Sequence, residues 1–439
     1  MQTVSLQIYY TIFYIPSIEY VKQNHIVLAT MQKNLAQFDL LNKSIEDFNS
    51  YGETLFTKSL EIIKSSQLST GGTTASLPGT RYAGHVYPRD HGYATRAYIA
   101  ADKLEEAEKA LDYILNCDLD PSGIMYQRYD EHGKNASYKP PQIDGNAQTL
   151  LSLAEFIKAS GRTELLRDKR IQIDALLMGI KSQLSHFPKG TLAYSINGII
   201  EYSSYEAGFE LYTNAVCYKA IKEIGSVMKN IKLDSLAEKI KDGISAYLYY
   251  PSLNTFIPCL RREPDVSFVL LANLKSFLAL TDFDVFDAKD EQIQSSLQYH
   301  LKGTSNGDLG AYNRYHYLMD RHNFGNGPWP MVMLRLAQYY NKIADKEKQE
   351  QCFTWVMNVA KNNLDQPDTL PEHVSTDESF IEEYEAFIRI NDTAPRPSKE
   401  KEYTMINESR TFKELRLAYA VNPLVWSHSQ FILAWKETQ

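Results

Sequence analysis

The sequence predicts an all-α fold, an (α/α)6 barrel in which two concentric rings of helices form a six-hairpin toroid, with loop insertions and one short hairpin. Two observations predict this fold. Twelve segments carry apolar residues three and four positions apart, which is the spacing of one face of a helix. The loops between them collect the Gly, Pro, Asn and aromatic residues, and no fixed repeat of the tetratricopeptide or armadillo kind is present.

The order of these segments along the chain favours paired helices. In chain order they are 43–66, 91–101, 103–116, 145–160, 163–186, 208–228, 234–249, 266–280, 288–301, 328–343, 346–363 and 423–437. One helix of each pair ends near a loop rich in Gly or aromatic residues and the next helix returns, as in a helical barrel. A solenoid of helix pairs has a similar periodicity and is the alternative architecture.

Three segments are expected to lie outside the helical repeat. Residues 1–38 are expected to form an N-terminal extension to one main domain that spans 39–439. Leu192–Ser195 and Ile199–Tyr202, on either side of Asn197-Gly198, are expected to form a hairpin. Residues 375–410 are rich in Glu, Lys, Asp and Ser, and they predict a surface insertion or lid.

Composition excludes several classes of function. Hydrophobic residues make up 44% of the chain and charged residues 23%, as in a soluble protein with a substantial core. A net charge of −8 without a long basic run argues against a nucleic-acid partner. The four cysteines lie far apart and are expected to be core thiols. The apolar stretch Ile8–Ile18 is too short to span a bilayer and lacks the features of a cleaved signal peptide. We expect a cytoplasmic monomer without a membrane partner, with specialised secretion as the alternative location.

Four short segments resemble one enzyme family. They are Tyr87–Asp90, Pro141–Gly145, Pro371–His373 and Trp426–His428. In this order they resemble the glucoamylases of glycoside hydrolase family 15, and the resemblance extends over roughly residues 80 to 437. It implies an (α/α)6 catalytic domain that releases glucose from the non-reducing ends of glycogen- or starch-like α-glucans with inversion. Trehalase, another α-glucosidase, and a catalytically impaired glycan-binding protein on the same barrel are the alternatives.

Inverting hydrolysis requires two carboxyl groups, one as general acid and one as general base. Glu372 resembles the family's base, which stands in Pro-Glu-Gln or Ser-Glu-Gln, although His373 replaces the Gln here. Tyr205-Glu206 takes the place of the family's Trp-Glu when two residues are deleted, which makes Glu206 the expected acid. Its aromatic neighbour would raise the pKa of the carboxyl by desolvation. Glu201 and Glu210 are the reserve candidates for the acid, and a helix-start role is the structural alternative for Glu206.

The resemblance also implies a set of sugar-binding residues. Arg89 and Asp90 are similar to the Arg and Asp that hold the terminal glucose in the family, and Arg314 resembles a second such arginine. Asp144 is expected either to support the acid or to cap a helix that starts at Gly145. Trp329 is expected to pack between helices. The full set of expected sugar-binding residues is Tyr87, Arg89, Asp90, Gln142, Asp144, Tyr205, Arg314, Trp426 and His428.

Histidines on expected loops raise the question of a metal site. They are His85, His91, His316, His322, His373 and His428. These positions do not show the paired ligand spacing of a zinc enzyme, and inverting glycoside hydrolysis requires no metal. We therefore expect neither a metal nor a cofactor.

Overall fold

The structure is a computed structural model that describes residues 36–80, 82–137, 139–196, 208–260, 268–269, 272–316, 327–376 and 409–439. Several expectations therefore lie outside the described residues. These are the acid candidates Glu206 and Glu201 with the neighbouring Tyr205, the second expected strand Ile199–Tyr202, His322, most of the extension 1–38 and most of the insertion 375–410.

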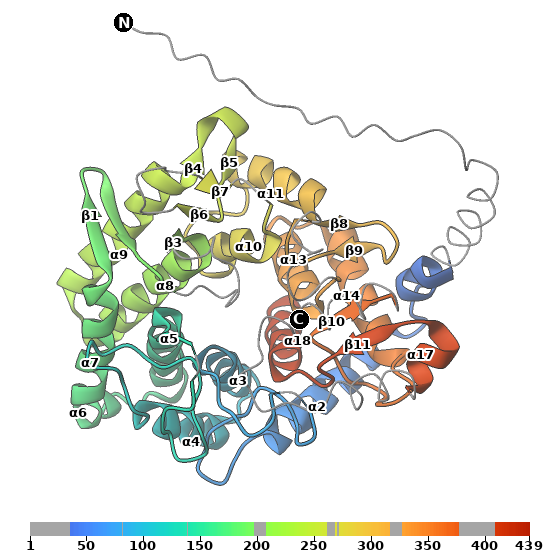
Figure 1. Ribbon diagram of the computed structural model, residues 1–439, viewed down its shortest axis with the longest axis horizontal. Coiled ribbons are helices and arrows are strands. Elements are labelled where there is room, and N and C mark those ends of the chain that lie inside the picture. The colour runs from blue at the N-terminus through green and yellow to red at the C-terminus, as the bar shows by residue number, and fades with distance from the viewer. Residues whose placement is uncertain are drawn as a thin grey trace, which may run out of the picture.

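An inner ring of helices surrounds the barrel axis (Figure 1). Its members are α3 (Pro88–Ala100), α5 (Ile143–Ser160), α8 (Leu211–Met228), α10 (Leu274–Asp282), α13 (Pro330–Lys342) and α18 (Val425–Thr438). Each packs on the next in chain order, and α18 packs on α3 to close the ring.

An outer ring covers the inner one. Its members are α2 (Phe48–Ser65), α4 (Leu104–Leu115), α7 (Arg170–Ser182), α9 (Ile231–Gly243), α11 (Glu291–Thr304) and α14 (Lys346–Lys361). Among the described residues, each ring holds six helices, and outer helices alternate with inner ones along the chain. The (α/α)6 barrel predicted from the sequence is confirmed.

The two rings differ in how their helices are buried. In the outer helix α4, buried residues such as Ala107, Ala110, Leu111 and Ile114 recur three and four positions apart, so one face meets the core. In the inner helix α5, burial is nearly continuous from Ile143 to Ile157, as expected for a helix surrounded by others.

The loops between the helices contain short strands and turns. The strands are β1 (Leu184–Phe187), β2 (Gly190–Ala193), β3 (Phe209–Glu210), β4 (Tyr249–Tyr250), β5 (Thr255–Phe256), β6 (Cys259–Leu260), β7 (Phe268–Val269), β8 (Ser305–Asn306), β9 (Ala311–Tyr312), β10 (His373–Ser375) and β11 (Ala418–Ala420). They pair antiparallel as β1–β2, β4–β5, β8–β9, β10–β11 and β3–β6–β7. Two short α-helices, α6 (Leu165–Asp168) and α17 (Arg410–Leu415), and a 3-10 turn, η2 (Pro251–Leu253), complete the loops.

One expected helix is wrong in part, and the expected partner of Leu192–Ser195 lies outside the described residues. Residues 163–186 form α6, α7 and then β1, which pairs with β2 in a hairpin that the sequence did not predict. The chain turns at Pro188-Lys189-Gly190 because Gly190 adopts a positive φ of 146°. A side chain at Gly190 would also collide with the backbone of Gly243, since a Cβ there would lie 2.3 Å from its nitrogen.

Two further expected helices end or begin differently. Helix 234–249 becomes α9 followed by a π-helical turn, η1 (Ile244–Leu248), and the strand β4. Helix 266–280 is wrong at its start, because residues 268–269 form β7 and α10 begins only after Asn273. The Asn273 side chain accepts a hydrogen bond from Ser276 N and so caps the helix.

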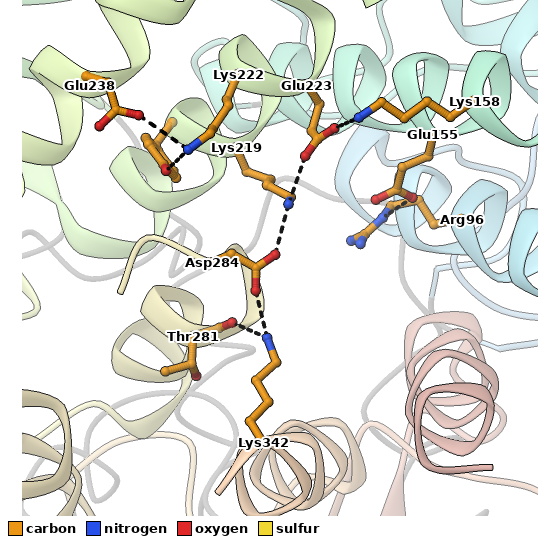
Figure 2. Close-up of polar contacts among 11 residues, drawn as sticks. Arg96, Glu155, Lys158, Lys219, Lys222, Glu223, Glu238, Thr281, Asp284 and Lys342 are labelled. Carbon is orange, nitrogen blue, oxygen red and sulfur yellow. Dashed lines mark hydrogen bonds and ion pairs between the residues drawn. The ribbon is translucent and has the colours of Figure 1, made fainter. Parts of the chain in front are cut away.

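A chain of alternating charges connects three inner helices, α5, α8 and α13, through Asp284 in the loop after α10 (Figure 2). Lys158 of α5 contacts Glu223 of α8, Glu223 contacts Lys219, and Lys219 contacts Asp284, which also pairs with Lys342 of α13. Burial opposes the charged form of both carboxyls, but the flanking ammonium groups hold the pKa of Glu223 and of Asp284 below its usual value. Glu223 and Asp284 are therefore ionised at neutral pH, whereas burial raises the pKa of two neighbouring carboxyls at this end, Asp282 and Glu437.

Candidate active site

The inner helices all begin at one end of the barrel, because an outer helix returns the chain between each of them. We call this the N-terminal end of the inner ring, and the opposite one the C-terminal end. Helix starts present unpaired amides and a positive dipole, which favour carboxylates and hydroxyl oxygens. The four sequence segments that carry the resemblance lie at these helix starts or beside them, as the bounds of α3, α5 and α18 show.

Arg89 joins the starts of α3 and α5. Its Nε donates to Asp144 Oδ2 at 2.5 Å and its Nη2 donates to Gln142 Oε1 at 3.2 Å. The Arg89 and Asp144 side chains are both more than nine-tenths buried, so removing one partner would leave the other as an unpaired buried charge. The expected helix cap at Asp144 is wrong: α5 begins at Ile143, and Asp144 faces Arg89. Asp90 is buried in the first turn of α3, where the helix dipole favours an acid.

Glu372, the candidate base, is held between the loop that carries Tyr82 and the strand β11. Its amide donates to Ala420 O at 2.8 Å. The Tyr82 hydroxyl lies 3.2 Å from Oε1 and 3.3 Å from Oε2 of the Glu372 carboxylate. The Tyr82 ring also packs edge-on against Tyr87, with centroids 5.7 Å apart. Tyr82 therefore connects the candidate base to the segment that carries Arg89.

Sequence reasoning missed Tyr82. It is one of 30 tyrosines, and its place in the loop that leads to Tyr87 is the one signal that could have singled it out. A phenol that donates to a carboxylate favours the ionised form, which is the form a general base needs.

Two residues at the start of α18 hold the Glu372 segment. Ser427 Oγ donates to Pro371 O at 2.7 Å, and Leu370 N donates to His428 Nε2 at 3.0 Å. His428 Nδ1 then carries the proton and donates to Ser59 Oγ at 2.9 Å. Burial lowers the pKa of His428 to about 3, so the ring is neutral. Both ring nitrogens are engaged, which corrects the expected sugar contact of His428 to a role in positioning this segment.

Trp426 occupies the same helix start. Its ring stacks on Tyr93, with centroids 5.0 Å apart and planes 30° from parallel. The indole is buried, and its Nε1 has no hydrogen-bond partner among the described residues. A buried indole N–H normally finds an acceptor, so Trp426 remains a candidate donor to a substrate hydroxyl.

Arg314 lies against two aromatic rings. Its Cζ is 4.4 Å from the Trp329 ring centroid and 4.6 Å from that of Tyr315. Arg314 is 8% exposed and both rings are buried. Trp329 packs as expected, and the group it packs against is the candidate sugar-binding arginine.

Glu210, a reserve candidate for the general acid, is the N-cap of α8. Its Oε2 accepts from Thr213 N at 2.8 Å and from Thr213 Oγ1 at 2.6 Å, and its Oε1 accepts from Ser276 Oγ at 2.9 Å and from Tyr212 N at 3.3 Å. Glu210 is fully buried, and these four hydrogen bonds commit both of its carboxylate oxygens to capping α8 and holding Ser276. Glu210 therefore leaves the set of acid candidates.

Three buried histidines follow one pattern, which sequence reasoning also missed. His91, His300 and His428 each accept a hydrogen bond from a loop amide through one ring nitrogen and engage a second oxygen through the other. The amides are those of Thr73, Asn273 and Leu370. Burial lowers the pKa of His91 and of His300 to about 4, so both are neutral like His428. The loop positions expected for His91 and His428 are wrong, since they lie in α3 and α18.

Other features of the described residues are simple. No cluster of three His, Cys, Asp or Glu side chains is arranged to hold a metal in the part of the chain that the structure describes. Over the same part, no helix is long and apolar enough to cross a membrane. The four cysteines are buried and unbonded to one another, which confirms them as core thiols.

Comparison with known proteins identifies similar folds. No protein-family model and no curated sequence matches this chain. A structure described as a wild-type glycosidase is 14% identical with a TM-score of 0.66, over 90% of this chain and 99% of that one. A bacterial glucoamylase complexed with acarbose is 17% identical with a TM-score of 0.62, over 95% of this chain and 58% of that one. A sugar epimerase from a ruminal bacterium is 14% identical with a TM-score of 0.52, over 74% of this chain and 89% of that one. At these identities the likeness establishes the fold, which all three share.

Proposed function

We propose that this protein is a glycoside hydrolase, and specifically an inverting, exo-acting α-glucosidase of the glucoamylase type that acts on glycogen- or starch-like α-glucans. One observation carries the proposal. The Glu372 carboxylate meets the Tyr82 hydroxyl, and Tyr82 packs on Tyr87 in the segment that carries Arg89. Two segments far apart in the sequence, each resembling part of one enzyme's site, are thus connected through Tyr82. The glycosidase and glucoamylase among the similar structures add support.

The chemistry assigns one role to each of two carboxyl groups. Glu372 takes a proton from a water molecule, and the water oxygen forms a bond to the anomeric carbon. The bond from that carbon to the glycosidic oxygen breaks, and its electron pair stays on the leaving oxygen. Glu206 then supplies the proton to that oxygen. An inverting enzyme keeps the two carboxyls about 6.5–9.5 Å apart so that the water fits between them.

The remaining candidates would hold the terminal sugar. Arg314 and Asp90 would contact its hydroxyls, and the indole N–H of Trp426 would donate to one of them. Arg89, tied to Asp144 and Gln142, would present a fixed edge of polar atoms between the starts of α3 and α5. Tyr87 and Tyr205 complete the proposed contacts.

Other functions fit the same barrel. Trehalase or another α-glucosidase would use the same pair of carboxyls on a different substrate. A glycan-binding protein would keep the sugar contacts without the acid. The sugar epimerase among the similar structures shows that the fold alone does not select hydrolysis. The expected monomeric state and cytoplasmic location stay predictions.

The test is release of glucose from glycogen and from maltooligosaccharides, followed by polarimetry of the first product formed. We expect glucose of inverted anomeric configuration. Glu372→Gln and Glu206→Gln should each lower kcat about 10²- to 10⁴-fold, the usual contribution of a proton-transfer group. Glu347→Gln, an exposed position on α14, is the matched control and should leave kcat unchanged.

The outcomes separate the candidates. Binding of maltooligosaccharides without release of glucose would favour a glycan-binding protein. Hydrolysis of trehalose alone would favour trehalase. Interconversion of free sugars without hydrolysis would favour an epimerase. Full activity in Glu372→Gln would remove the proposed base.

A further inference from the structure

A stack of rings and one guanidinium runs from the strand beside Glu372 to Arg314. The imidazole of His373 stacks on the Trp329 indole, with centroids 5.8 Å apart and planes 17° from parallel. The Trp329 ring in turn contacts the Arg314 guanidinium at 4.4 Å, and Tyr315 contacts the same guanidinium at 4.6 Å. His373 follows Glu372 directly in the chain, so the stack begins beside the candidate base and ends at a candidate sugar-binding cation.

The backbone joins the same three segments. Val374 N donates to Pro328 O at 3.0 Å, which ties β10 to the residue before Trp329. Pro328 also forms a β-bridge with Asn313, the residue before Arg314. The approach is close: a Cβ at Gly327 would lie 1.8 Å from Val374 O, so a side chain there would force the two segments apart.

The stack limits how the Arg314 guanidinium can turn. A guanidinium against an aromatic face is attracted by the negative face of the ring, and the attraction grows when water is excluded. Arg314 is 8% exposed, and His373, Trp329 and Tyr315 are each 2% exposed or less. A planar cation held in this way presents its N–H groups in a fixed plane, which is how an arginine selects the orientation of neighbouring oxygens.

We propose that His373 is a positioning residue for sugar binding: it supports Trp329, and through Trp329 it fixes the plane of the Arg314 guanidinium relative to Glu372. The proposal rests on the proposed function for its substrate. It differs from what the resemblance implies, because the glucoamylase pattern has Gln after the base and an amide cannot stack as an aromatic ring does. In this chain the orientation of the arginine would come from ring stacking through His373.

The first test changes the ring without changing its neighbours. His373→Gln removes the aromatic face, and it should raise KM for maltooligosaccharides roughly 3- to 10-fold, the value of one stacked pair. The proposed contacts of Arg314 hold sugar hydroxyls away from the reacting bond in both the ground state and the transition state, so kcat should change much less than KM. His373→Phe keeps a ring and should restore most of the affinity. A loss in kcat with KM unchanged in His373→Gln would overturn the proposal.

A double-mutant cycle tests whether His373 acts through Arg314. Arg314→Gln alone should raise KM. Adding His373→Gln to that background should raise KM no further, since there is no guanidinium left to orient. Additive effects of the two substitutions would mean that His373 acts by another route.

The matched control is a second buried ring pair of the same geometry. Phe431 and Trp435 on α18 stack with centroids 5.8 Å apart and planes 11° from parallel. Among the described residues their other ring partners are Phe48 and Phe353, not Trp329 or His373. Phe431→Leu should lower the melting temperature and leave KM unchanged. An equal rise in KM in this control would mean that any loss of stacking loosens the site.

One test of the proposal does not depend on enzymatic activity. Crystal structures of the wild type and of His373→Gln should differ in the Arg314 guanidinium, which we expect to rotate or become disordered in the variant. An unchanged guanidinium would overturn the proposal even if the enzyme is active. If neither protein hydrolyses or binds a glucan, the proposed function fails, and this structural comparison alone decides whether His373 positions Arg314.

Discussion

The two ends of the inner ring hold their charges in different ways. At the C-terminal end, Lys158, Glu223, Lys219, Asp284 and Lys342 alternate in sign along a chain of side chains, and Asp284 is 59% exposed. At the N-terminal end, charged and polar groups are buried and are held by backbone amides, aromatic rings and neutral histidines.

The difference reflects what each end has to fix. Long, partly exposed ion pairs balance charge but leave their members free to move, and each contributes little to stability. Buried groups with several hydrogen bonds have one arrangement, and breaking it costs more. The N-terminal end therefore has the fixed geometry that the proposed chemistry requires. The chain of pairs through Asp284 has the weaker pairing that suits a structural joint, and the buried Arg335–Asp282 pair is the exception at the C-terminal end.

Mild acid should produce the largest difference in stability between the two ends, because it protonates the buried histidines of the N-terminal end. His91, His300 and His428 have folded pKa values of about 4, 4 and 3, below the ordinary 6.5. The folded state thus binds fewer protons, so stability is complete above pH 6.5 and is lost as the pH falls toward the folded values. At pH 5 the loss is about 2 kcal/mol per histidine, or about 6 kcal/mol in total. Urea unfolding at pH 7 and pH 5 measures it.

Hydrogen exchange identifies which end opens first. The pKa values of Glu223 and Asp284 lie below the usual carboxyl value, so the ion pairs of these two side chains persist in mild acid. At pH 5 the amides of Thr73, Asn273 and Leu370, which donate to these histidines, should therefore lose protection against exchange, relative to the intrinsic rate at that pH, before the amides of α9 or α13. Stability that is flat between pH 7 and pH 5 would contradict the role of the histidines.

Replacing Glu210 should weaken the fold at the N-terminal end. Glu210→Gln puts an amide NH₂ where Thr213 or Ser276 donates, so about 3 kcal/mol of unfolding free energy should be lost. The denaturant midpoint measures this loss, and kcat of the folded enzyme should change little. Unchanged stability with a hundredfold fall in kcat would return Glu210 to the candidates for general acid.

Tyr82→Phe should have a smaller effect, and on activity. Loss of one hydrogen bond to the Glu372 carboxylate costs about 1.5 kcal/mol, or about tenfold in kcat. The acid limb of the kcat/KM profile should move to higher pH, since the ionised form loses a donor. Tyr419→Phe is the control, because the Tyr419 hydroxyl donates to Val359 O and not to Glu372. An unchanged pH profile in Tyr82→Phe would mean that the phenol does not act on the carboxylate.

The smallest effect is expected at the C-terminal end. Asp284 pairs with Lys219 and Lys342, each at 2.9 Å, but its side chain is largely exposed. Asp284→Asn should therefore cost less than about 1 kcal/mol of unfolding free energy, and less again in high salt. Denaturant titrations at low and high salt measure it. A change in kcat would show that the two ends are coupled.

Much of the fold was accessible from the sequence because its helices are long and their apolar spacing is regular. Helix α14, for example, begins at Lys346 as expected, because Asp345 caps it with a hydrogen bond to Lys348 N. The errors fall where a tertiary contact decides. The turn at Gly190 depends on its approach to Gly243, and the start of α10 depends on the capping by Asn273.

The candidate site was accessible only in part. The pattern around Glu372 identified a carboxylate at the N-terminal end, but not the hydroxyl of Tyr82 beside it, because that contact spans 290 residues. Glu210, a reserve candidate for the acid, proved to be a helix cap, and Asp144, expected to support the acid or cap a helix, pairs with Arg89. The sequence shows which side chains can accept a hydrogen bond, but the folded barrel determines which donor lies beside each of them.

The packing of α18 on α3 has a consequence for how the molecule assembles. Every other joint of the inner ring connects helices that are neighbours in the ring's chain order, but this one joins residues 88–100 to 425–438. Contacts of such long sequence separation form slowly, since the entropy of closing a large loop is lost before the contact is gained. Until this seam forms, the chain is an open arc with two apolar edges, each able to receive the matching edge of a second chain. Domain-swapped dimers formed during refolding at high concentration would be joined at this seam.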